Sequence, residues 1–190
     1  YLSFVLAAQT EDGRFRNRRG TDLGWIGEPS VEDCWGRALW GLGAAVSGHG
    51  EAGHPEAALS AFERGAGWRS PHRRAMAFAA LGAAEILDVM PDHRGARELL
   101  AAASTMIGRP QGTEGWLWPE PRLSYANAVL PEVLLAAGAA LAIVGFTVVG
   151  RRDDGPALTL VHGAAALDYS GRYLAMVAYA GQLGALTALS

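Results

Sequence analysis

The sequence predicts an all-α protein assembled from antiparallel helical hairpins. Apolar residues recur at helical spacing in roughly six segments of residues 1–140. Strand signals are nearly absent before Val144. The connections between the segments alternate between long and short, which is the pattern expected when each helix runs antiparallel to the one before it.

The first elements are predicted from their boundaries. Residues 1–9 form the apolar end of a helix, and residues 10–29, rich in Gly, Asp, Arg and Asn, predict an ordered loop or a short hairpin. The second helix begins at Ser30, because residues 30–33 match a capping box, and Gly48 ends it. A third helix is expected over residues 54–62.

The later helices follow the same rules. Ser70 and Pro71 begin a fourth helix that ends before Pro91. Asp92 caps a fifth helix, which reaches Ile107. A sixth helix is expected from Leu123 to about residue 141, and Pro131 is placed to kink it.

Residues 141–190 form a second region, for which the sequence leaves a continuation of the helical array and a different structure open. The uncharged stretch 133–150 has the length of a marginal transmembrane helix. Its glycines and alanines favour a buried helix followed by a strand or turn. We therefore expect no membrane span.

Composition excludes several classes of function. The chain of 190 residues is 50% hydrophobic with a formal net charge of −3, which gives no reason to expect binding to nucleic acid or to an acidic membrane surface. The single Cys34 permits neither an internal disulfide nor a cysteine-based zinc site. The five histidines show no metal-ligand spacing, so we expect neither a metal nor a cofactor, and these side chains are expected to be exposed or to cap helices: His49, His54, His72, His93 and His162.

The beginning of the chain indicates a piece of a longer protein. It starts at Tyr1, within a helix, and shows no signal peptide, so a cytoplasmic location is expected. P-loop, strand-led G-x-G-x-x-G and G-x-S-x-G motifs are absent, and the residues do not build the α/β domain of a nucleotide-sugar transferase.

The alternating connections predict one face that carries a functional site. Every second connection of an antiparallel array lies at the same end, which places segments 10–29, 67–70 and 108–122 together, opposite 48–53 and 89–91. The predicted face holds tryptophans and acids, namely Trp25, Trp68, Trp116, Trp118, Glu11, Asp12, Asp22, Glu28, Glu114 and Glu120. Indoles and carboxylates at one end of a helical array are typical of a site that processes sugars.

Three carboxylates are candidate catalytic groups. Glu32 and Asp33 lie at a helix N-terminus, where the dipole keeps them ionised as a base or as acceptors for sugar hydroxyls; the alternative is simple capping. Glu120 lies in apolar company that raises a carboxyl pKa and suits an acid, or it is a rim carboxylate bonded to Arg122. An acid–base pair across a glycosidic bond requires carboxyls roughly 5–10 Å apart.

Other side chains are candidates for substrate binding. Trp25, Trp116 and Trp118 are expected to stack on pyranose rings, whereas Trp35 and Trp40 belong to the core and Trp68 suits either role. Tyr125 and Asn127 can bond sugar hydroxyls, although Asn127 equally suits a cap or a pinned loop. Arg37 can steer an anionic group or form a buried ion pair with Glu32 or Asp33.

Several motifs resemble known families. Residues 9–15, QTEDGRF, look like the Q-x-x-D-G-x-[FW] turn of six-hairpin glycosidases, triterpene cyclases and protein prenyltransferases. The Asp-rich motif of terpene cyclases and the cysteine-containing zinc site of prenyltransferases are absent. The runs 12–17, 30–40, 70–75, 116–120 and 123–131, in this order, resemble bacterial glycosyltransferase-like proteins that contain an α/α-toroid domain.

The resemblance covers residues 1–140 and implies a fold and an activity. It implies an α/α toroid, here an incomplete ring, that acts on an oligosaccharide or glycoside by cleavage or transfer. Acids expected near Pro121 and at Ala126 are missing, and later repeats are not recognisable in 141–190. The alternative is a non-catalytic glycan-binding or scaffold domain of a larger protein. A third possibility is an incomplete ring that functions only within a longer chain or a homo-oligomer.

Overall fold

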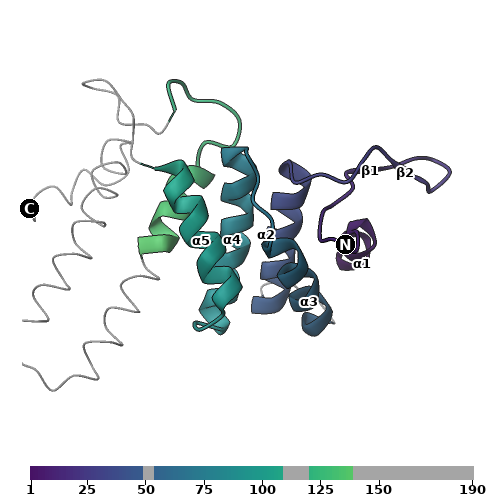
Figure 1. Cartoon of the computed structure of the whole chain (residues 1–190), viewed down its shortest axis with the longest axis horizontal. Coiled ribbons are helices and arrows are strands. Elements are labelled where there is room, and N and C mark those ends of the chain that lie inside the picture. The colour runs from purple at the N-terminus through teal and green to yellow at the C-terminus, as the bar shows by residue number, and fades with distance from the viewer. Residues whose placement is uncertain (49–53, 109–119, 139–190) are drawn as a thin grey trace, which may run out of the picture. The chain divides into compact units, whose positions relative to one another are not determined.

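A computed structural model describes residues 1–48, 54–108 and 120–138 of the chain, and the described part is mostly helical (Figure 1). The chain divides into two compact units, Tyr1–Ile107 and Gly108–Ser190. The elements of the first unit are α1 (Leu2–Ala8), β1 (Arg18–Arg19), β2 (Trp25–Ile26), α2 (Asp33–Ser47), α3 (Pro55–Ala66), α4 (Arg73–Val89) and α5 (Arg94–Ile107).

Helices α2 to α5 form two hairpins that lie side by side. Helix α2 packs against α3, α4 packs against α5, and the most extensive contact joins α2 to α4. A Cβ atom on Gly36 would overlap the carbonyl oxygen of Ala75, and one on Gly43 would overlap that of Gly82. The later residue of α2 meets the later residue of α4, and the sequence separation is the same in both contacts. The two helices α2 and α4 therefore run parallel. Figure 1 shows these two helices side by side.

The core lies between these helices. Its largest fully buried side chains in the first unit include Trp35, Phe62, Leu39, Met76 and Leu99. The Trp35 indole Nε1 donates a hydrogen bond to the carbonyl oxygen of Gly65 at 3.1 Å and so joins the first turns of α2 to the end of α3. The prediction of Trp35 as a core residue is confirmed, while Trp40 is half-buried and its ring stacks on Phe78 at 5.9 Å.

Two helices begin later than the sequence rules predict. The residue before α2 is Glu32, which makes no side-chain cap, so the capping box predicted at 30–33 is wrong. The hydroxyl of Ser30 instead accepts a hydrogen bond from the Glu32 amide at 3.4 Å, and Ser70 Oγ accepts one from the His72 amide at 3.1 Å before α4. A serine that bonds an amide two residues ahead forms a turn that competes with the helix.

The cap of α5 also differs from the prediction. The ring Nδ1 of His93 accepts a hydrogen bond from the Ala96 amide at 3.1 Å, whereas the carboxylate of Asp92 bonds Arg97 Nη2 at 2.7 Å. His93 is therefore the capping residue. The predicted ends are confirmed where a backbone constraint sets them: α2 ends at Gly48, whose φ is 80°, and α4 ends before Pro91.

Residues 10–29 contain a short hairpin, one of the two structures predicted for them. Strands β1 and β2 pair antiparallel with Arg18 opposite Ile26 and Arg19 opposite Trp25. The all-helical prediction is thus confirmed for most of the described chain, with a two-stranded hairpin added. The toroid and its incomplete ring stay predictions.

In the second unit, the described residues 129–138 are helical. The helix predicted from Leu123 therefore begins later, and Pro131 lies in its first turn. A proline there costs no helical hydrogen bond, so no kink arises from it. The predictions for residues 141–190 lie outside the described residues, as do those for most of the stretch 133–150. Among the helices described, none has the length and apolar character required to cross a membrane.

Candidate functional site

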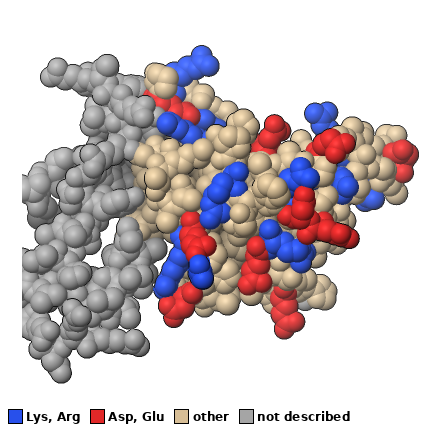
Figure 2. All heavy atoms as spheres, viewed as in Figure 1, with Lys and Arg blue, Asp and Glu red and all other residues tan. Residues whose placement is uncertain are grey.

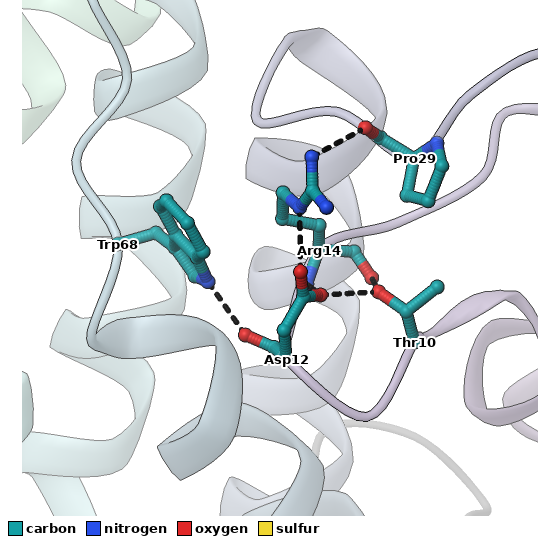
Figure 3. A network of polar contacts seen from close by, with 5 residues as sticks. All are labelled: Thr10, Asp12, Arg14, Pro29 and Trp68. Atoms are coloured by element: carbon teal, nitrogen blue, oxygen red, sulfur yellow. Dashed lines mark hydrogen bonds and ion pairs between the residues drawn. The ribbon is translucent and has the colours of Figure 1, made fainter.

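The turn formed by residues 9–15 is organised around the Asp12 carboxylate (Figure 3). Asp12 accepts hydrogen bonds from the Thr10 hydroxyl at 2.6 Å, from the Arg14 amide at 3.2 Å and from Arg14 Nε at 2.8 Å. These donors, the Thr10 hydroxyl first and then Arg14, lower the pKa of Asp12 to about 2. Asp12 is therefore held as an anion within its own turn.

The same turn is attached to the end of α3. Gln9 Nε2 donates to the carbonyl oxygen of Ala61 at 2.7 Å, and Arg64 Nη2 donates to Gln9 Oε1 at 2.8 Å. Gly13 has a φ of 89° and lies directly against the carbonyl oxygen of Arg64. Phe15 is fully buried, at 1% exposure. The residues of the Q-x-x-D-G-x-F run thus hold the chain in place, and their local role is structural.

Two of the three segments predicted to share a face lie at the same end of the unit. Trp68 Nε1, in the connection between α3 and α4, donates to the main-chain oxygen of Asp12 at 2.6 Å. The parallel helices α2 and α4 also begin at this end. The third segment, 108–122, falls mostly outside the described residues, and with it Glu114, Trp116 and Trp118.

The two described tryptophans of this face are already in contact with arginines. The guanidinium of Arg14 lies 5.6 Å from the ring centre of Trp68, which is 38% exposed. Trp25 is half-buried, with the Arg19 guanidinium 5.1 Å from its ring centre and the Phe4 ring 5.5 Å away. A pyranose that stacks on the arginine-covered face of either indole must displace the guanidinium, which contributes a cation–π interaction. The sequence did not indicate these arginines, because the contacts are made by the folded turns.

Glu32 and Asp33 differ from Asp12 in their surroundings. Glu32 is exposed and Asp33 is half-buried. Within the described parts of the chain, neither carboxylate makes a hydrogen bond or an ion pair, and the capping role that was their alternative is not formed. Both lie at the start of α2, where the free amides of the first helical turn favour negative charge.

Arg37 follows one turn later on α2. It is exposed, and its guanidinium lies 4.8 Å from the centre of the Phe78 ring on α4. Because the side chain is exposed, the alternative of a buried ion pair with Glu32 or Asp33 does not hold. Its predicted role in steering an anionic group stays a prediction.

The remaining predicted site residues belong to the second unit. Glu120 is half-buried, and Tyr125 is 54% exposed. Asn127 Oδ1 accepts a hydrogen bond from the Ser124 amide at 2.8 Å, across a turn in which Ala126 has a φ of 51°. Asn127 therefore pins this turn, as its alternative role predicted.

The described residues contain no group of three or more His, Cys, Asp or Glu side chains that could hold a metal ion. Comparisons of the chain with protein-family models, with curated proteins and with solved structures found no match.

Proposed function

We propose that this chain is a carbohydrate-binding protein of the α/α-toroid type, which holds an oligosaccharide at the N-terminal end of α2. The observation that carries the proposal is the pair Glu32 and Asp33. Both carboxylates lie at a helix start without a partner among the described residues. The Asp12 carboxylate, in contrast, already accepts hydrogen bonds from Thr10 and Arg14 of its own turn. Carboxylates accept charge-assisted hydrogen bonds from hydroxyl groups, and neighbouring hydroxyls of a sugar offer such donors in pairs.

The mixed charge of the face in view supports a neutral ligand. Figure 2 shows basic and acidic side chains interspersed on the face in view, without a large area of one sign. Trp68 lies at the same end of the unit, and its indole remains 38% exposed. The two parallel helices α2 and α4, each paired with an antiparallel neighbour, also fit the layered hairpins of a toroid.

Glycoside cleavage or transfer is the second candidate function. The half-buried Asp33 favours it, because a carboxylate without a hydrogen bond among the described residues is available as a general base to a bound substrate. Glu32 and Asp33 are neighbours on one helix end, and a glycosidic bond needs carboxyls on two sides of it. Cleavage therefore requires a further acid on another element.

A binding experiment with matched variants tests both candidates. The folded protein is titrated with a panel of neutral and anionic oligosaccharides by tryptophan fluorescence and calorimetry, and turnover of the same panel is measured. Asp33→Asn is expected to weaken binding of a neutral oligosaccharide roughly tenfold, since a charge-assisted hydrogen bond is lost. Asp88→Asn, an exposed position near the opposite end of α4, is the control and should bind as the unmodified protein does.

The outcomes separate the two functions. If Asp33→Asn abolishes turnover but leaves binding intact, Asp33 is a catalytic group and the protein is an enzyme. A loss of affinity in a protein that shows no turnover supports binding alone. If no oligosaccharide binds while the helical circular dichroism is intact, the carbohydrate proposal is wrong.

A further inference from the structure

His93 occupies a position at which three elements meet. It directly precedes α5, its side chain is only 10% exposed, and its ring lies edge-on to Phe62 of α3 at 6.2 Å. Nδ1 accepts the Ala96 amide of α5 at 3.1 Å, and Nε2 lies 3.3 Å from Glu63 Oε1 of α3. A single imidazole thus caps one helix and contacts a carboxylate on another.

These two contacts define the form of the ring. A nitrogen that accepts a hydrogen bond carries no proton, so in the neutral imidazole the proton is on Nε2. That proton faces Glu63, and both contacts are satisfied together. A second proton on Nδ1 would face the Ala96 N–H, and the cap would be lost.

Charged groups from α3 and α5 surround the His93 ring and affect its contacts with Ala96 and Glu63. From α3, Glu63 favours a positive ring, but its carboxylate is 56% exposed, and exposed pairs contribute little. From α5 and the preceding loop, the neighbouring charges neutralise each other, because Arg94 pairs with Glu98 at 2.7 Å and Arg97 with Asp92 at 2.7 Å. The partial positive charge at the start of α5 opposes a cation there.

We propose that His93 is a proton-operated latch on the first turn of α5, closed by the neutral ring and opened when Nδ1 gains a proton, while Nε2 keeps its contact with Glu63 of α3. A proton on Nδ1 removes the acceptor of the Ala96 amide and so releases the first turn of α5. The role is independent of the carbohydrate site at the start of α2.

Hydrogen exchange of single amides tests the latch in the whole chain. The protection factor of the Ala96 amide, measured by NMR and corrected for intrinsic exchange, should fall roughly fivefold or more between about pH 7.5 and about pH 5, the loss typical of a removed N-cap. The amide of Ile86, in the buried part of α4, is the internal reference and should keep its protection. The ring shifts at high pH should show the proton on Nε2.

Two variants distinguish a latch from a general effect of acid. His93→Asn keeps a capping acceptor but cannot be protonated, so Ala96 should be equally protected at both pH values. Glu63→Gln removes the carboxylate and should leave the pH dependence in place. Equal protection in the unmodified protein, a proton on Nδ1 at high pH, an unchanged pH dependence in His93→Asn, or its loss in Glu63→Gln would each overturn the proposal.

Discussion

Among single residues, Asp12 shows how a predicted site acid becomes a structural one. Its carboxylate receives the Thr10 hydroxyl, the Arg14 amide and the Arg14 guanidinium, and its main-chain oxygen receives the indole of Trp68 (Figure 3). A carboxylate with so many donors has little capacity left for a substrate. The acids available for chemistry are therefore those that the turns leave unbonded.

The lowered pKa of Asp12 predicts a loss of stability in acid. The folded pKa is about 2 against an ordinary value of 3.8, so the group stabilises the fold above the ordinary value. This contribution is lost as the pH falls from about 3.8 toward 2. Replacing Thr10 with Val removes the largest cause of the shift and should move the Asp12 pKa upward, as an NMR titration of the carboxyl carbon would show. A pKa unchanged from about 2 in this variant would contradict the assignment of the Thr10 hydroxyl as the main cause.

Gly13 provides a test of how tightly the same turn is held. Gly13→Ala should destabilise the protein by at least about 2 kcal/mol, because the new Cβ meets the carbonyl of Arg64 and the residue keeps a φ of 89°. Gly27 is the matched control, since its φ is 83° and nothing lies within 4 Å of the added Cβ. Gly27→Ala should cost only about 1–2 kcal/mol from backbone strain. Urea unfolding of both variants measures the difference, and equal losses would show that the contact with α3 is unimportant.

At the scale of the elements, the sequence rules located the ends of α2 and α4 better than their starts, whereas for α3, expected over 54–62, they located the start better than the end. Gly48 and Pro91 impose constraints of the backbone itself, and α2 and α4 end where these residues require. The hydroxyls of Ser30 and Ser70 can accept a hydrogen bond from any of several nearby backbone amides, so they do not fix the first residue of a helix. Each bonded an amide two residues ahead, so the helices began later. The cap of α5 was assigned to Asp92, although capping was one of the two roles expected for His93, because the orientation of the His93 ring depends on Phe62 of another helix.

The contact between α2 and α4 predicts opposite effects for two glycines on the helices that form it. A Cβ on Gly82 would overlap the backbone of Leu39, so Gly82→Ala should push the helices apart and cost about 1–3 kcal/mol. Gly41 lies on the exposed side of α2 with nothing within 4 Å of an added Cβ. Gly41→Ala should therefore stabilise the protein by about 0.5–1 kcal/mol through helix propensity alone.

Thermal and urea unfolding of the two glycine variants give the comparison. A stabilising Gly82→Ala would show that the two helices are not in close contact. A destabilising Gly41→Ala would show that the exposed side of α2 is covered in the protein.

At the scale of the molecule, alternating connections correctly predicted that the loop at 10–29 and the connection at 67–70 share one end, because antiparallel hairpins require it. The same reasoning could not identify which acids would be engaged in structural hydrogen bonds at this end. The hydrogen bonds of Asp12 depend on the positions that Thr10, Arg14 and Trp68 take in the folded chain. Nor does any sequence pattern encode the distance between carboxylates on different elements, on which glycoside chemistry depends. Fold class followed from periodicity, and the identity of the site did not.

The parallel contact of α2 with α4 also determines how a chain of this kind can change in length. Gly36 meets Ala75 and Gly43 meets Gly82 at the same separation in sequence, so the two helices stay in one register along their contact. A change in the length of a connection outside these helices leaves that register intact. An insertion of a few residues inside α2 instead moves Gly43 away from Gly82 and brings a larger side chain against the backbone. Changes in length that preserve this contact are therefore expected in the connections between helices and not inside α2 or α4.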